Sequence, residues 1–172
     1  MNTSKRKIMT AIQTFPTWKT VKIGTGHKAI KDFCKSEIGL TVQILKSLKV
    51  STIEKEVRLV RVTISDLGLP DPRGAHNSEV VKAAKSFGLR TCPLEVGPQL
   101  MLQYTDQPVG ETIIVGMSSV LVTGTRYKQR CVLTVTAAEK GRYLSCHSSI
   151  DDTWGLDVYW RPNWEGIFIQ DK

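Results

Sequence analysis

Cys92 and Glu95 are the residues whose types and spacing most directly suggest chemistry, because a cysteine thiolate is a nucleophile and a nearby carboxylate can move a proton. They lie in the segment CPLEVGPQLMLQYTDQP, residues 92–108, which also holds Asp106 as a second acid. A nucleophilic cysteine needs a histidine or another positive charge beside it, and no histidine is near Cys92 in the sequence. Two interpretations stay open: a hydrolase or transferase that uses Cys92 and Glu95, or a structural turn.

The structural interpretation of this segment is a bend that leads into a β-strand. Its prolines and Gly97 favour a turn, and the apolar residues of 100–104 would then lie on one face of a strand. Gln99 and Gln103 lie outside that apolar face. They could line a polar ligand pocket, which is a third interpretation of the same residues.

A second candidate site is the glycine turn KIGTGHKAIK, residues 22–31. A strand that passes through glycines into a helix N-terminus can present backbone N–H groups to a phosphate. The third glycine of a dinucleotide-binding fingerprint is missing here. Gly24 and Gly26 are therefore candidate phosphate-binding residues, with a tight strand-to-helix turn as the alternative explanation.

The net charge of +8 is unevenly distributed along the chain. Residues 1–61 contain thirteen Lys and Arg but four Asp and Glu, whereas the rest of the chain contains eleven and twelve. An acidic partner is therefore expected at the first third of the chain. The lysines at 28, 31 and 35 share one face of a predicted helix, opposite its apolar residues. The candidate nucleic-acid-binding residues are Lys28, Lys31, Lys35, Lys46 and Lys49.

RNA or DNA is the partner that we favour, because several lysines on one surface can contact phosphates without sequence preference. An acidic protein bound by a protein–protein regulatory module is the alternative, and solvated surface lysines need no partner at all. The C-terminal segment gathers five of the twelve aromatic residues, which suit either base stacking or a core. These residues are Trp154, Tyr159, Trp160, Trp164 and Phe168.

Several classes of protein are excluded by composition. The four cysteines form no C-x-x-C pair and the three histidines stand apart, which predicts reduced thiols and no metal site. No cofactor motif is present, so we expect no cofactor. No apolar run approaches the roughly 20 residues needed to cross a bilayer, so we expect no membrane association and a cytoplasmic location.

The fold that must position these residues is predicted to have helices early and strands late. Residues 1–16 are expected to form a flexible tail before one α+β domain at 17–172, whose early helices pack on a mostly antiparallel sheet. A glycine turn that feeds a helix is expected at 24–37, with further helices at 42–49 and for about ten residues from Asn77. Strands are expected at 18–24, 56–65, 100–104, 112–122, 130–137, 142–148 and 166–170.

One hairpin is specific enough to predict its register. The loop AEKG, residues 138–141, ends in a glycine that tolerates positive φ. This loop would pair Leu133 with Cys146 on one face. Cys131 would lie diagonally from Cys146 on that face, so the two thiols are expected to be neighbours.

One long stretch of the chain resembles a known family. The residues that carry the resemblance are LGL at 67–69, the segment from Phe87 to Glu111, and IVGM at 114–117. Their core reads C-P-x-E-V-G-P-Q-L-x-L-Q-Y-x-D-Q-P-x-G-E. In these residues the chain resembles a family of small uncharacterised bacterial proteins. The resemblance implies a small stand-alone bacterial protein and no particular activity.

Overall fold

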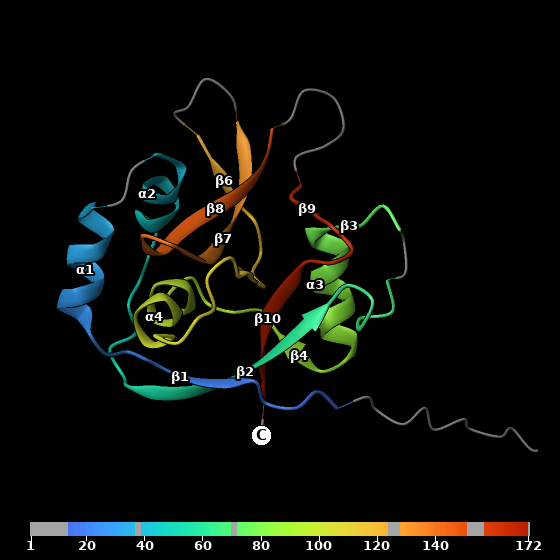
Figure 1. Cartoon of the computed structure of the whole chain (residues 1–172), viewed down its shortest axis with the longest axis horizontal. Helices are drawn as coiled ribbons and strands as arrows, with labels where there is room; N and C mark the ends of the chain where they lie inside the picture. Colours follow the sequence, from blue (N-terminus) through green and yellow to red (C-terminus); the bar gives the residue numbers. More distant parts are fainter. Residues whose placement is uncertain (1–13, 37–38, 70–71, 124–127, 151–156, 172) are drawn as a thin grey trace, which may run out of the picture.

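The computed structural model describes residues 14–36, 39–69, 72–123, 128–150 and 157–171, without the side chains of 33–36 and 149–150 (Figure 1). The described helices are α1 (His27–Ser36), α2 (Gly39–Leu45), α3 (Asn77–Ser86) and α4 (Val96–Gln103). The described strands are β1 (Lys19–Ile23), β2 (Lys55–Thr63), β3 (Ala75–His76), β4 (Leu89–Arg90), β5 (Thr112–Val115), β6 (Val120–Val122), β7 (Gln129–Ala138), β8 (Gly141–Ile150), β9 (Tyr159–Trp160) and β10 (Glu165–Gln170). In the described part, no helix has the length and apolar character needed to span a bilayer.

Eight of these strands form one sheet in the order β1-β2-β10-β5-β7-β6, with β4 beside β10 and β8 beside β7. Pairing is antiparallel except between β5 and β10, so the predicted α+β class with a mostly antiparallel sheet is confirmed. Helix α4 contacts β1 near one end of the sheet and also β7 and β8 near the other end. These contacts show that the sheet is bent around the helix. Figure 1 shows α4 between these two parts of the sheet.

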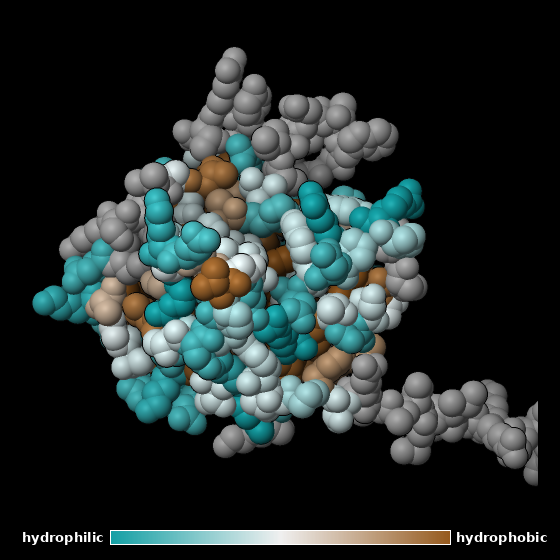
Figure 2. Space-filling view, in the orientation of Figure 1, coloured by the Kyte–Doolittle hydropathy of each residue, from teal (hydrophilic) through white to brown (hydrophobic). Residues whose placement is uncertain are grey.

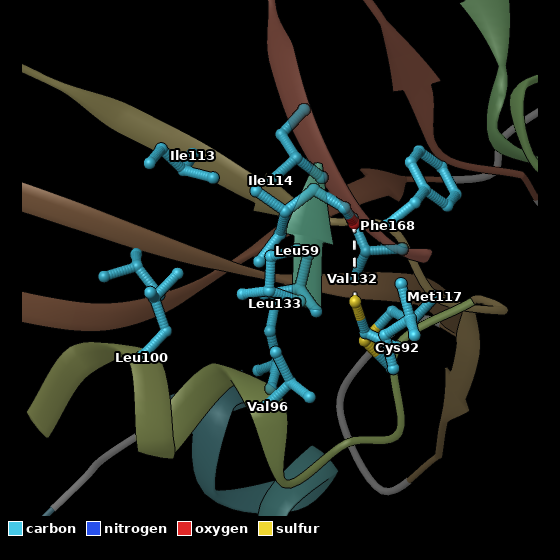
Figure 3. Close-up of a cluster of buried hydrophobic side chains, with 14 of the residues drawn as sticks. Leu59, Cys92, Val96, Leu100, Ile113, Ile114, Met117, Val132, Leu133 and Phe168 are labelled. Carbon is cyan, nitrogen blue, oxygen red and sulfur yellow. Dashed lines mark hydrogen bonds between the residues drawn. The ribbon is translucent and has the colours of Figure 1, made fainter. Parts of the chain in front are cut away.

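The main core lies where α4 meets the bent sheet. Hydrophobic side chains reach the surface only in patches among hydrophilic ones (Figure 2), and most of the apolar side chains of α4 and the sheet are buried. Val96 and Leu100 of α4 point toward the sheet, where Leu133 meets them (Figure 3). A Cβ atom on Gly97 would lie 2.8 Å from Leu133 Cδ1. Glycine at this position therefore allows the helix to approach the sheet closely.

The predicted strand at 100–104 is wrong, because these residues belong to α4 and its C-terminal end. Pro98 lies in the first turn of the helix, where its missing N–H has no partner to lose. Val96 and Leu100 are one helical turn apart on the buried face. A short apolar run does not distinguish a buried helix from a strand, so periodicity alone misassigned it.

The prediction that the helices come before the strands in the sequence is also only partly correct. Helices α1, α2 and α3 are found where they were expected, but α4 lies between β4 and β5, in the later part of the chain that was expected to form strands. The predicted strand at 112–122 is divided into β5 and β6. A Cβ atom on Gly116 would lie 2.5 Å from the Ile167 carbonyl oxygen, so a close backbone approach accompanies this break.

The hairpin register is confirmed. Strands β7 and β8 pair Leu133 with Cys146 and Ala138 with Gly141, so the loop itself contains two residues. Cys131 and Cys146 are neighbours, since their thiols share a hydrogen bond.

Candidate functional site

The lysines predicted to bind nucleic acid lie on helix α1 and on the segment that follows α2. Lys28 and Lys31 are exposed on α1, and Lys46 and Lys49 are exposed after α2. Lys35 is also in α1, but its side chain lies outside the described residues. The surface over α1 is largely hydrophilic, with hydrophobic side chains showing beside it (Figure 2).

A cleft of about 360 Å³ separates α1 from the connection between α2 and β2. Its lining is mostly aliphatic, with one imidazole, one hydroxyl and one lysine, and includes Ile30, Leu45, Leu48, Val50, His27 and Lys31. We call this feature, together with Lys28, Lys46 and Lys49, the basic cleft. An apolar floor beside several cations suits an anionic partner that also buries some apolar surface.

Several cations of the first third lie in ion pairs on β1 and β2. The positive charge of these two strands is therefore partly neutralised. The pairs join Lys19 to Asp106, Lys22 to Glu54, and Arg61 to both Glu111 and Glu165.

Glu95, the residue before α4, connects the two segments that form the basic cleft. Its side chain is 2% exposed. One carboxylate oxygen accepts the N–H of Gly24 at 2.7 Å, and the other accepts the N–H of Ser51 at 2.8 Å. The Ser51 carbonyl oxygen in turn lies 3.0 Å from His27 Nε2. A buried carboxylate thus fixes the glycine turn before α1 against the connection after α2.

Two glutamines continue this polar connection along α4. The Nε2 atom of Gln99 donates to Glu95 Oε1 at 3.2 Å and to the Thr25 carbonyl at 2.8 Å. The Nε2 atom of Gln103 donates to Gln99 Oε1 at 2.8 Å and to the Lys22 carbonyl at 2.7 Å, while its Oε1 accepts the Lys22 N–H at 2.9 Å. These amides therefore attach α4 to the end of β1 and do not line a ligand pocket.

The glycines of the predicted phosphate site have a structural role in the turn. Gly24 has a φ of +77°, and a Cβ atom there would lie 2.2 Å from the Ile53 carbonyl oxygen. Its N–H already donates to Glu95, so a phosphate could take this donor only by displacing the carboxylate. Gly26 has a φ of +61° with open space around it, and its carbonyl accepts the N–H of Ile30 as α1 begins. The geometry thus favours the tight strand-to-helix turn at Gly24.

Cys92 is sealed in the core, which argues against the alternative in which it acts as a nucleophile with Glu95. The thiol is 5% exposed and donates to the Ile167 carbonyl at 3.4 Å (Figure 3). Burial raises the pKa of the Cys92 thiol far above its ordinary value, and Arg90 opposes this only in part. A buried neutral thiol beside a fully hydrogen-bonded carboxylate is an unsuitable catalytic pair.

The C-terminal aromatic residues contribute mainly to the core. Trp160 and Phe168 are fully buried and stack with ring centroids 6.3 Å apart. Trp164 is partly buried, and Tyr159 is 36% exposed. Trp154 lies outside the described residues. Core packing thus explains Trp160 and Phe168, while Trp164 and Tyr159 stay partly accessible.

The sequence analysis did not predict that Glu95, Gln99 and Gln103 attach α4 to β1 and to the turn at Gly24. Their spacing of four residues could have indicated this role, because residues at that spacing share one face of a helix. Because a strand was predicted for this segment, the glutamines were placed on a sheet and their helical spacing was not recognised. Ser51 and His27 carry no local pattern that would reveal their contact.

Comparisons of the chain with protein-family models, with curated proteins and with solved structures find no match. The resemblance to small bacterial proteins therefore stays a prediction.

The first prediction concerns Glu95. Glu95→Gln replaces one acceptor oxygen with an NH₂ group, which faces the N–H of Gly24 or Ser51 and leaves it unpaired. We expect urea unfolding to show a loss of about 1–3 kcal/mol in the free energy of unfolding. Glu54→Gln is the matched control, because its exposed ion pair with Lys22 should change stability by less than about 0.5 kcal/mol. Equal stability of the two variants would contradict the structural role of Glu95.

The second prediction concerns cysteine reactivity. Hydrogen bonds from the Cys131 thiol and the Thr41 hydroxyl lower the pKa of Cys146, which is only partly buried, whereas Cys92 is buried with a raised pKa. Iodoacetamide should therefore label Cys146 on the order of 100-fold faster than Cys92 in the native protein, as measured by peptide mapping. Cys92→Ala should cost about 1–2 kcal/mol of stability. Rapid labelling of Cys92 would show that its thiol is accessible and ionised.

Proposed function

We propose that this protein is a small cytoplasmic binding protein that holds RNA or DNA at the basic cleft, through contacts to phosphates. The observation that carries the proposal is the exposure of Lys28, Lys31, Lys46 and Lys49 on the two segments that border one cleft, which Lys31 lines. Lys19, Lys22 and Arg61 of the same third of the chain are instead held in ion pairs. Exposed lysines on neighbouring segments attract a polyanion and release its condensed counterions on binding.

The chemistry of the cleft predicts little sequence preference. Lysine ammonium groups contact phosphates as point charges, and these contacts set position but do not identify bases. The described lining is mostly aliphatic, with the His27 imidazole but no Phe, Tyr or Trp ring on which a base would stack. Affinity should therefore depend on salt far more than on sequence.

An acidic protein is the second candidate partner. The aliphatic lining favours it, because an acidic peptide with apolar side chains could place them against Ile30 and Leu48 while its carboxylates meet the lysines. The two candidates differ in a measurable way, since only nucleic acid carries a regular array of phosphates and a steep salt dependence.

The third prediction tests the nucleic-acid proposal by charge removal. Replacing Lys28, Lys31, Lys46 and Lys49 together by glutamine should weaken binding to single-stranded RNA and double-stranded DNA about equally, as measured by fluorescence anisotropy. It should also flatten the salt dependence by roughly 0.7–0.9 log units per lost phosphate contact for each tenfold change in salt. The fold should survive, because the four side chains are exposed.

The matched control removes the same charge elsewhere. Lys82 and Lys85 are exposed on α3, and Lys128 and Lys140 are exposed near the ends of β7. Replacing these four by glutamine should leave affinity within about twofold of wild type, because direct contacts outweigh the screened net charge. No binding by the wild-type protein at low salt, or equal losses in the two variants, would refute a nucleic-acid site at the basic cleft.

A further inference from the structure

A second cavity lies on the face of the sheet that points away from α4. Along β7, Leu133 faces α4, as its contact with Gly97 shows, so Thr134 and Thr136 face the other way. A cavity of about 250 Å³ opens over these threonines. Its lining includes Thr112, Thr134, Thr136, Ser145, His147 and Trp164. None of the residues named for the basic cleft belongs to it.

The floor of this cavity is an array of hydroxyl groups. Thr112 and Thr136 are directly opposite on β5 and β7, with their Oγ1 atoms 3.0 Å apart. Thr134 and Ser145 are directly opposite on β7 and β8, with Oγ1 and Oγ 2.8 Å apart. A hydroxyl has one donor and two acceptor sites. Because each pair uses one O–H internally, its other O–H and several lone pairs remain for a ligand.

One wall of the cavity is formed by two rings. His147 and Trp164 pack edge to face with centroids 4.5 Å apart. The imidazole donates a hydrogen bond to the Tyr159 carbonyl, and burial together with the Arg161 charge lowers the pKa of His147. The lining itself contains no Asp, Glu, Lys or Arg, and the nearby Arg161 lies over the Trp164 ring with its Cζ 5.5 Å from the ring centroid.

A lining without Asp, Glu, Lys or Arg favours an uncharged ligand. An ion would lose hydration in this cavity, and the lining would offer it no ammonium, guanidinium or carboxylate group in return. Hydroxyls that both donate and accept are matched best by groups that do the same, which are the hydroxyls of a ligand. The volume lies just below the roughly 300 Å³ at which most ligand pockets begin, so the ligand is no larger than one ring.

We propose that this hydroxyl-lined cavity binds a small uncharged polyhydroxylated ring compound, a monosaccharide or a cyclic polyol. The four hydroxyls of Thr112, Thr134, Thr136 and Ser145 hydrogen-bond the ring hydroxyls, and Trp164 covers an apolar edge of the ligand. The site is separate from the basic cleft, so its ligand binds independently of nucleic acid.

The fourth prediction tests this site with D-glucose, D-galactose, D-ribose and myo-inositol as probes. Saturation-transfer NMR should show saturable binding of at least one of them, in the millimolar range expected for a few hydrogen bonds. Thr134→Val and Ser145→Ala should each raise the Kd about threefold to tenfold, because each removes one hydroxyl from the floor. Ser145→Ala is the safer variant for folding, since Ser145 is less buried than Thr134.

Two controls make the outcome specific. Thr20→Val makes the same change at an exposed position on β1 and should leave the Kd unchanged. Glucose 6-phosphate should bind no more tightly than glucose, because no Lys or Arg is among the lining residues that would contact its phosphate. If none of the four probes saturates, or if both hydroxyl variants bind like wild type, the proposal is wrong.

Discussion

The buried carboxylate of Glu95 is the interaction on which the arrangement of the candidate nucleic-acid site depends. A buried anion is costly unless its oxygens are hydrogen-bonded, and here two backbone N–H groups and one amide satisfy them. The two N–H groups belong to segments far apart in the sequence, the turn at Gly24 and the connection at Ser51. Because one side chain holds both, α1 and the connection after α2 keep a fixed relation on either side of the cleft that Lys31 lines.

The position of Glu95 is itself set by the packing of α4. The helix lies inside the bend of the sheet, where Gly97 permits contact with Leu133 and where Gln99 and Gln103 attach it to β1. Apolar packing thus holds one side of α4 against β7, and hydrogen bonds hold another side against β1 and the turn that follows it. The same bend leaves the opposite face of β5, β7 and β8 free of α4, and its threonines and serine line the second cavity. The position of α4 on one face of the sheet therefore explains why the basic cleft and the hydroxyl-lined cavity are separate.

Much of the fold could be predicted from the sequence, since β1, α1, β2, α3 and the register of β7 with β8 all follow from local periodicity and turn chemistry. The segment around α4 could not, because eight mostly apolar residues fit a strand and a buried helix equally well. That one error concealed the site, since Glu95, Gln99 and Gln103 share a face only in a helix. The lysines were identified from charge alone, but their separation from Lys19, Lys22 and Arg61 depends on tertiary ion pairs. The hydroxyl-lined cavity escaped prediction because threonine and serine are ordinary on strands, and only the register places four hydroxyls together.

The most direct test of the central claim is a two-dimensional NMR titration of the protein with a short single-stranded RNA at low salt. If Glu95 holds α1 and the connection after α2 as one binding surface, amide shift changes should appear together in residues 27–31 and 46–52. The Gly24 and Ser51 amides should meanwhile stay protected from hydrogen exchange, because Glu95 keeps both hydrogen bonds. Shift changes confined to α3 or spread evenly over the surface, or rapid exchange of those two amides in the free protein, would contradict the account.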